Sequence, residues 1–375
     1  MNLAIDIVTT IVGVIIVFLA AWDGIESLVI PRSVDRRFGI TTVFYRITWS
    51  LLRFIAARVR KPETKHRLLA SYSPLSIICL IGIWAFAIIF GYAVILVGCH
   101  IQYANNPAPT FGDLLYYSGI TFFTVGFGDL TPISNLGRFF AVAEAATGFG
   151  FLGLLIGFVP VLYGLFSSRE AQILLLDSKA GSEPTAFELI RRHAEAEAWP
   201  ELQALLKQWE TLAAGLLENF ISFPVLAYYR SQHDGQSWLR SMTAILDACV
   251  LIETTFDDTA PGGKTLRFQA RATYAMCRHA VVDLSYLIGA TPVLNGPPRL
   301  SREMAAAMCK QLREVGAPIL CEETSGGRFD ELRRTYDPFV ITLADEIMLE
   351  LPDWQPDSEV VDNWQVSKWE GVRHL

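Results

Sequence analysis

Three long apolar runs occupy the first half of the chain, whereas the second half carries charges at ordinary density. The runs lie within residues 1–31, 75–98 and 137–166, and each holds few charged residues. A helix needs about 20 consecutive, predominantly apolar residues to cross the hydrocarbon core of a bilayer. The pattern therefore predicts three transmembrane helices, followed by a segment with the character of a soluble domain.

The second half predicts helices throughout. Beyond Arg169, apolar residues recur with helical spacing between glycine- and proline-containing breaks, and no alternating strand pattern of any length is present. We expect helices near residues 185–198, 200–219, 225–232, 237–253, 266–288, 301–314 and 328–350. The fold class expected is an all-α membrane protein. Its parts are an N-terminal transmembrane helix (1–31), a basic segment (32–74), a membrane domain (75–166), a helical cytoplasmic domain (167–350) and a C-terminal tail (351–375).

A basic segment separates the first two apolar runs. Only Asp35 and Glu63 oppose its positive charges. Positive loops stay in the cytoplasm, so residues 167–375 are also expected inside, and the N-terminus and residues 99–136 outside a plasma membrane. The basic residues are Arg32, Arg36, Arg37, Arg46, Arg53, Arg58, Arg60, Lys61, Lys65 and Arg67.

Part of this segment predicts an amphipathic helix at the cytoplasmic interface. Arg46, Arg53 and Arg60 recur every seven residues and so share one helical face, while apolar residues form another. Anionic lipid headgroups are the partner expected for Arg32–Arg67. A voltage sensor, with arginine at every third position in a span, fits the spacing poorly. A fourth span over residues 39–59 is an alternative, and it would place the first arginines outside.

Composition excludes several classes of function. The chain is 52% hydrophobic, and its net charge of −7 argues against nucleic acid as a partner. The six cysteines form no CxxC pairs, so neither a zinc site nor a disulfide framework is expected. No GxGxxG follows a strand, and no catalytic constellation is visible, so we expect neither an enzyme nor an organic cofactor. The first apolar run has no basic leader or small-residue cleavage motif, so we expect no signal peptide.

A short helix should lie between the second and third apolar runs. Thr110 and Asp113 have capping-box spacing, which predicts a helix from about Phe111 to Phe123. Such a helix has roughly half the length needed to cross a membrane, so it must end near mid-depth.

The sequence TFFTVGFGDLTP, residues 121–132, follows this helix and is punctuated by Gly126 and Gly128. Non-helical backbone at membrane depth is tolerated only where it is buried in protein or lines a water-filled path. Alternating glycines permit mirror-handed dihedrals, which let successive carbonyl groups point the same way. Four chains around one axis would then present rings of carbonyl oxygens that replace the hydration shell of a cation.

The motif T-x-x-T-V-G-F-G-D resembles the signature of the tetrameric potassium-channel family. The order of span, short helix, motif and span resembles that family too, over about residues 75–166. The resemblance implies a homotetramer whose filter carbonyls bind K⁺ as the permeant ligand. The residues implied at the filter are Thr124, with its hydroxyl, Val125, Gly126, Phe127 and Gly128.

Residues around the filter also take roles from the resemblance. Asp129 would lie at the outer mouth, where Tyr116 is placed to hydrogen-bond it from behind, and Thr121 would support the filter. Two residues depart from the commoner pattern: Phe127 replaces a tyrosine, and Phe123 stands where a threonine is common.

The third apolar run resembles the inner helix of that family. Gly148 stands at the hinge position, although close helix packing explains such glycines equally well. Pro160 should kink the helix near its inner end. Phe149, Leu152 and Ile156 share a face with Pro160, and an apolar constriction there could close by dewetting.

Glu144 is an ionisable residue within a span and therefore a functional candidate. Its position near the outer end of the third run places it behind the filter. A structural role, in which it hydrogen-bonds the short helix, is favoured over a role in proton sensing.

Taken together, the sequence predicts a potassium-selective, homotetrameric channel gated through the cytoplasmic domain by a signal that the sequence does not identify. One alternative is a membrane-anchored receptor or signalling protein with a non-conducting pore-like domain. Another is a weakly selective cation channel. The intact motif from Thr124 to Asp129 favours the potassium-selective channel over both alternatives.

Overall fold

The computed structural model describes residues 3–28, 39–231, 236–294, 296–320 and 327–356. These residues are almost entirely helical, and the only β pairings among them are two isolated bridges. The chain divides into two compact units, Met1–Gly164 and Leu165–Leu375. The predicted all-α membrane fold is confirmed, although Arg32, Arg36, Arg37 and most of the predicted tail lie outside the described residues.

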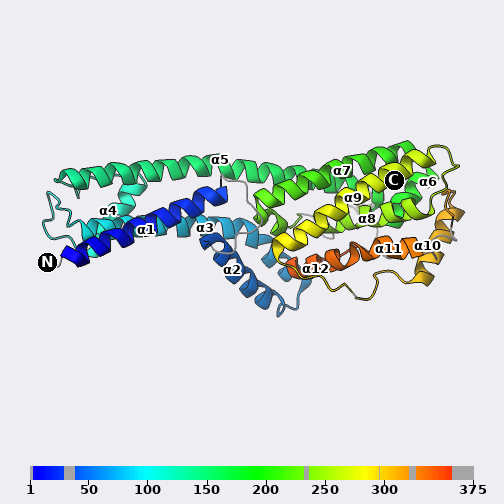
Figure 1. Cartoon of the computed structure of the whole chain (residues 1–375), viewed down its shortest axis with the longest axis horizontal. Helices are drawn as coiled ribbons and strands as arrows, with labels where there is room; N and C mark the ends of the chain where they lie inside the picture. The colour runs from blue at the N-terminus through cyan, green and yellow to red at the C-terminus, as the bar shows by residue number, and fades with distance from the viewer. Residues whose placement is uncertain (1–2, 29–38, 232–235, 295, 321–326, 357–375) are drawn as a thin grey trace, which may run out of the picture. The chain divides into compact units, whose positions relative to one another are not determined.

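The first unit contains the expected membrane helices (Figure 1). Three helices are long and apolar enough to cross a bilayer, in agreement with the three apolar runs. They are α1 (Leu3–Leu28), α3 (Pro62–Gly98) and α5 (Asn135–Ala180); the boundary between the two units falls within α5. The shorter helices α2 (Ile40–Ala56) and α4 (Phe111–Phe122) belong to the same unit.

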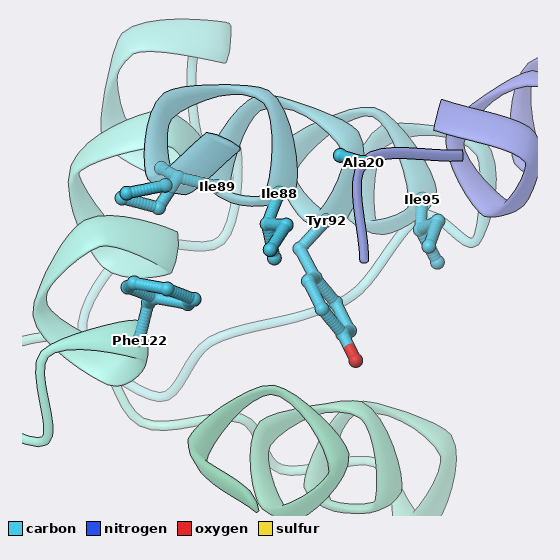
Figure 2. Close-up of a cluster of buried hydrophobic side chains, with 7 residues drawn as sticks. Ala20, Ile88, Ile89, Tyr92, Ile95 and Phe122 are labelled. Carbon is cyan, nitrogen blue, oxygen red and sulfur yellow. The ribbon is translucent and has the colours of Figure 1, made fainter. Parts of the chain in front are cut away.

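Helices α1 and α3 pack closely through glycines. A Cβ added to Gly13 would lie 2.7 Å from the carbonyl oxygen of Gly91, and one added to Gly98 would lie 2.4 Å from Thr10 Oγ1. Small residues allow this approach within a membrane. Figure 2 shows the apolar cluster that continues from this contact, with Ala20 of α1 and Phe122 of α4 packed on side chains of α3.

A buried carboxylate joins the first three helices. Asp23 of α1 accepts hydrogen bonds from the backbone N–H of Thr41 (3.1 Å), the Thr41 hydroxyl (2.7 Å) and Trp84 Nε1 (2.8 Å). Since Thr41 lies in the first turn of α2, Asp23 satisfies a free amide at that helix end. The contact fixes the start of α2 against α1 and α3.

Helix α2 is amphipathic, as the basic segment predicts. Trp49 is buried and contacts Tyr72 of α3, whereas Ile47, Leu51 and Phe54 are exposed. With 17 residues the helix is shorter than a typical span, which disfavours the alternative of a fourth span. It ends at Ala56, so Arg60 does not continue the face of Arg46 and Arg53, and a voltage-sensor pattern is absent from it.

Two membrane helices are longer than predicted. Helix α3 begins at Pro62 rather than Leu75, because proline suits the first helical position and the polar turns that follow extend the helix before the apolar run. It continues through Pro74. Helix α5 likewise continues through Pro160 to Ala180 without an interruption of its helical assignment.

The second unit is a helical domain built around α8 (Trp238–Thr255), in which every residue is buried. Helices α7 and α9 make extensive contact with each other, and α9 also packs on α8 (Figure 1). The surrounding elements are α6 (Ala186–Glu195), α7 (Trp199–Ser222), the 3₁₀ helix η1 (Pro224–Tyr228), α9 (Gly263–Ile288), α10 (Arg302–Glu314), α11 (Gly327–Arg334) and α12 (Asp337–Ile347).

Two helix predictions in this unit are wrong. The helix expected over 225–232 is the short 3₁₀ helix η1, because Pro224 opens it and Tyr229 is extended; residue 232 lies outside the described residues. The helix expected over 328–350 is divided into α11 and α12 at Thr335 and Tyr336, where Tyr336 leaves the helical conformation before Pro338.

Buried charges hold α8 to the C-terminal helices. Arg299 donates to both carboxylate oxygens of Asp247 (3.0 and 2.9 Å) and to Asp337 (3.3 Å), and the Tyr336 hydroxyl donates to Asp247 (2.5 Å). Burial raises the pKa of Asp337 to about 6, which Arg299 opposes. Because each charge has a partner, we interpret the cluster as structural.

Candidate ion-conduction site

Helix α4 is capped and short, as its sequence predicts. The capping box is formed: Thr110 N–H donates to the Asp113 carboxylate (2.8 Å), and Asp113 N–H donates to Thr110 Oγ1 (3.3 Å). The helix comprises 12 residues, or about 18 Å, against a hydrocarbon core of about 30 Å. It is therefore too short to cross a membrane by itself.

The residues after α4 alternate in backbone handedness. We refer to residues 124–128 as the filter segment. Its φ angles are positive at Thr124 (56°), Gly126 (55°) and Gly128 (80°), but not at Val125 or Phe127. Positive φ is uncommon for a β-branched residue such as threonine and costs little for glycine. The glycines were expected to adopt this conformation, but nothing in the sequence predicted it for Thr124.

The end of α4 binds the amide groups of the filter segment. Thr124 N–H donates to Thr121 O (3.0 Å), while the N–H groups of Val125 and Gly126 both donate to Ile120 O (2.8 and 3.3 Å). These amides are thereby satisfied within the chain. The filter residues are exposed in the single chain, so their surface is available to an ion and to neighbouring chains.

Loop contacts brace the residues beyond the filter segment. Tyr116 of α4 lies near the side chain of Asp129, as the sequence predicts. Asn105 Nδ2 donates to the backbone carbonyl of Asp129 (3.2 Å), and Ala104 N–H donates to Thr131 O (3.0 Å). The loop after α3 and the loop after the filter segment are thus paired. Thr121, which the sequence predicts to support the filter, lies one helical turn after Tyr117 in α4.

A polar cluster lies behind the filter segment, between α3, α4 and α5. The Ser118 hydroxyl of α4 is within hydrogen-bond distance of both Ile89 O (2.7 Å) and Glu144 Oε1. The Tyr92 hydroxyl, which points toward α5 in Figure 2, lies 3.0 Å from Thr147 Oγ1. Sequence reasoning placed Glu144 but missed Ser118. A serine flanked by apolar residues in a membrane helix was the available signal.

Gly148 occupies a closely packed position. A Cβ added there would lie 1.8 Å from the carbonyl oxygen of Phe122, the last residue of α4. Of the two explanations for this glycine, the structure supports close packing, and it carries no observation of a hinge. Gly150, Gly153 and Gly157 differ, because a Cβ on any of them would meet no atom of the chain within 4 Å.

One apolar face of α5 is exposed among the described residues of the first unit. Phe149 (71% exposed), Leu152 (53%) and Ile156 (66%) lie on it, together with exposed Pro160. Only 11% of the most apolar window of α5 is buried. Since an unpartnered apolar face on a membrane helix faces lipid, a neighbouring helix or a cavity, this is the face through which assembly or gating can act.

Comparisons with known proteins agree with this geometry. The model of an ion-channel family matches residues 76–161. Protein LctB of Geobacillus stearothermophilus is 35% identical over 77 residues, which are 18% of this chain and 57% of LctB. Protein LctB of Bacillus caldotenax matches with the same identity and coverage. The chain thus spans somewhat more than half the length of these relatives. No solved structure matches the chain.

Proposed function

We propose that the ion-channel domain at residues 76–161 forms a homotetrameric, potassium-selective pore whose filter is the segment from Thr124 to Gly128. The observation that carries the proposal is the alternating handedness of this segment, combined with amide groups bound by the end of α4. In such a backbone, carbonyl oxygens can line one side, where they replace the water around a dehydrated K⁺ ion.

Four chains are required because each chain supplies only one quarter of each ring of carbonyl oxygens. The filter segment and the apolar face of α5 are both uncovered in the single chain. Exposed non-helical backbone is not stable against lipid, so assembly around a shared axis supplies the missing environment.

Flux and stoichiometry test this function together. We expect purified protein in liposomes to conduct K⁺ and Rb⁺ and strongly exclude Na⁺, and native mass spectrometry to detect a tetramer. Monomers or dimers alone would contradict the assembly. A tetramer without flux would favour the non-conducting receptor, and equal Na⁺ and K⁺ flux would favour the weakly selective channel.

The basic segment orients the proposed channel. We propose that α2 lies at the cytoplasmic face, where exposed Arg46, Arg58 and Arg60 meet anionic lipid headgroups. The C-terminal unit would then also be cytoplasmic, and residues 99–136, which contain no Lys or Arg, would face outward in the plasma membrane.

Cysteine labelling in intact cells tests the orientation. We expect a membrane-impermeant thiol reagent to label Ala108→Cys and not Thr64→Cys, because the two exposed positions lie on opposite sides in this topology. The unsubstituted protein reports the background from native cysteines. Labelling of Thr64→Cys alone would reverse the proposed topology.

We also propose that the C-terminal unit controls the pore through α5. The helix passes from one unit into the other without a loop. Within the second unit, Arg169 near its inner end is buried and donates to Leu226 O and Tyr229 O, both at 2.9 Å. A rearrangement around η1 would therefore be transmitted to α5. The signal that drives it is left open.

A further inference from the structure

We propose that Glu144 is protonated in the folded channel and that its carboxyl group donates a hydrogen bond to Ser118, which in turn donates to the backbone carbonyl of Ile89. This relay would connect α5, α4 and α3. It deepens the proposed function and rests on it, because Ser118 lies on the helix that holds the filter segment. Glu144 acts here as a positioning residue and does not touch the ion.

The Ser118 hydroxyl has too few hydrogens to donate to both of its contacts. Ser118 Oγ lies 2.7 Å from Ile89 O and also contacts Glu144 Oε1. A serine hydroxyl has one hydrogen, and a backbone carbonyl can only accept. If Ser118 donates to Ile89, the contact with Glu144 needs a hydrogen from the carboxyl group. An ionised Glu144 would leave one of the two contacts as a repulsive pair of oxygens.

The other oxygen of the Glu144 carboxyl group also favours the protonated form. Glu144 is fully buried, and its Oε2 atom has no hydrogen-bond partner among the residues that the structure describes. Both oxygens of an ionised carboxylate carry charge, and burying them without donors is strongly unfavourable. A protonated carboxyl leaves only a neutral carbonyl oxygen unsatisfied. This observation is independent of the hydrogen count and favours the same protonation state.

The groups around Glu144 are consistent with a neutral carboxyl. The titratable groups near it on the packed elements are Tyr92 of α3, Tyr103 of the following loop and Tyr117 of α4. Tyrosine is ordinarily uncharged below a pH of about 10. On its own helix, Arg138 donates instead to Pro132 O (3.4 Å).

The relay has a functional consequence. While Glu144 keeps its proton, Ser118 holds α4 against both flanking helices, and the carbonyls at the end of α4 keep their positions relative to the filter amides. After loss of the proton at alkaline pH, the single hydrogen of Ser118 could serve only one of its two contacts, and the connection between α3, α4 and α5 would be broken at the other. We therefore expect K⁺ flux to fall reversibly as the pH becomes alkaline.

Infrared spectroscopy tests the protonation state without reference to flux. The carbonyl stretch of a protonated carboxyl lies at higher frequency than the bands of carboxylates and backbone amides. We expect the full-length protein at neutral pH to show such a band and Glu144→Gln to lose it. Glu63→Gln, at an exposed position, is the matched control and should lose carboxylate bands only. A Glu144→Gln difference spectrum that loses carboxylate bands instead would overturn the proposal.

Flux measurements give the second readout. Glutamine can donate to Ser118 at any pH, so Glu144→Gln should retain K⁺ flux and lose its alkaline decline, whereas Glu144→Leu, of similar size, should lose most of the flux. Should Glu144→Gln retain the alkaline decline of the unsubstituted protein, the relay is not its cause and the proposal fails.

Two further results test the relay and the channel function separately. If Glu144→Gln does not accumulate, Ser118→Ala replaces it: the carboxyl band should move to higher frequency as the hydrogen bond is lost, and an unmoved band would count against the relay. If the unsubstituted protein shows the band but never conducts K⁺, the protonated carboxyl stands and the proposed channel function fails.

Discussion

Gly126→Ala and Gly128→Ala should each abolish selective K⁺ flux while leaving the membrane helices folded. A Cβ at Gly126 or Gly128 would meet no atom of the same chain within 4 Å, so the effect comes from the backbone. Both residues have φ in the left-handed region, which costs an L-residue about 1–2 kcal/mol. In the proposed tetramer the penalty would recur in each of the four chains, and the segment already holds Thr124 in this conformation.

The control for these two variants is a glycine whose substitution should leave K⁺ flux unchanged. Gly82 of α3 is helical and exposed, and a Cβ there would also meet nothing within 4 Å. We expect Gly82→Ala to conduct as the unsubstituted protein does, because alanine favours a helix over glycine by about 1 kcal/mol. Rb⁺ and Na⁺ uptake into liposomes, with circular dichroism as a check on folding, measures both predictions. Normal selectivity for K⁺ over Na⁺ in Gly126→Ala would show that residues 124–128 are not the filter.

The local rules predicted the membrane architecture well because they depend on few neighbours. Capping-box spacing at Thr110 and Asp113 located the start of α4, and apolar run length located the three spans. The start of α3 was missed because the polar turns after Pro62 carry no apolar signal. Helical propensity near Pro224 was overridden by the extended backbone at Tyr229.

The site was predictable where a motif defines the backbone and unpredictable where contacts come from distant segments. Alternating glycines indicated the conformation of the filter segment, but the positive φ of Thr124 depends on amide bonds to Ile120 and Thr121. The partnership of Ser118 with Ile89 and Glu144 joins residues 29 and 26 positions away. The steric role of Gly148 similarly depends on Phe122, which no periodicity reveals.

The second large effect is expected at a gate, which we place on the exposed apolar face of α5. Phe149, Leu152, Ile156 and Pro160 share this face by helical spacing and are exposed in the part of the chain that the structure describes. Four such faces around one axis would form an apolar ring, which excludes water and ions when it narrows. We propose that the closed gate lies between Leu152 and Gly164, where α5 approaches the second unit in the chain.

Ile156→Asn should raise resting K⁺ flux by about tenfold or more, which corresponds to a shift of about 1.4 kcal/mol between closed and open states. The amide would keep water in a constriction that isoleucine leaves dry, whereas Na⁺ exclusion, set at the filter segment, should be unchanged. Val161→Asn is the matched control, because Val161 is also exposed but lies about 140° around the helix from Ile156. Liposome flux without any added ligand measures the effect. Unchanged resting flux in Ile156→Asn, together with altered gating in Glu144 or Tyr116 variants, would place the gate at the filter segment. Glu144 contacts Ser118 of α4 and Tyr116 belongs to α4, the helix that precedes the filter segment, whereas neither lies near Ile156 in the sequence.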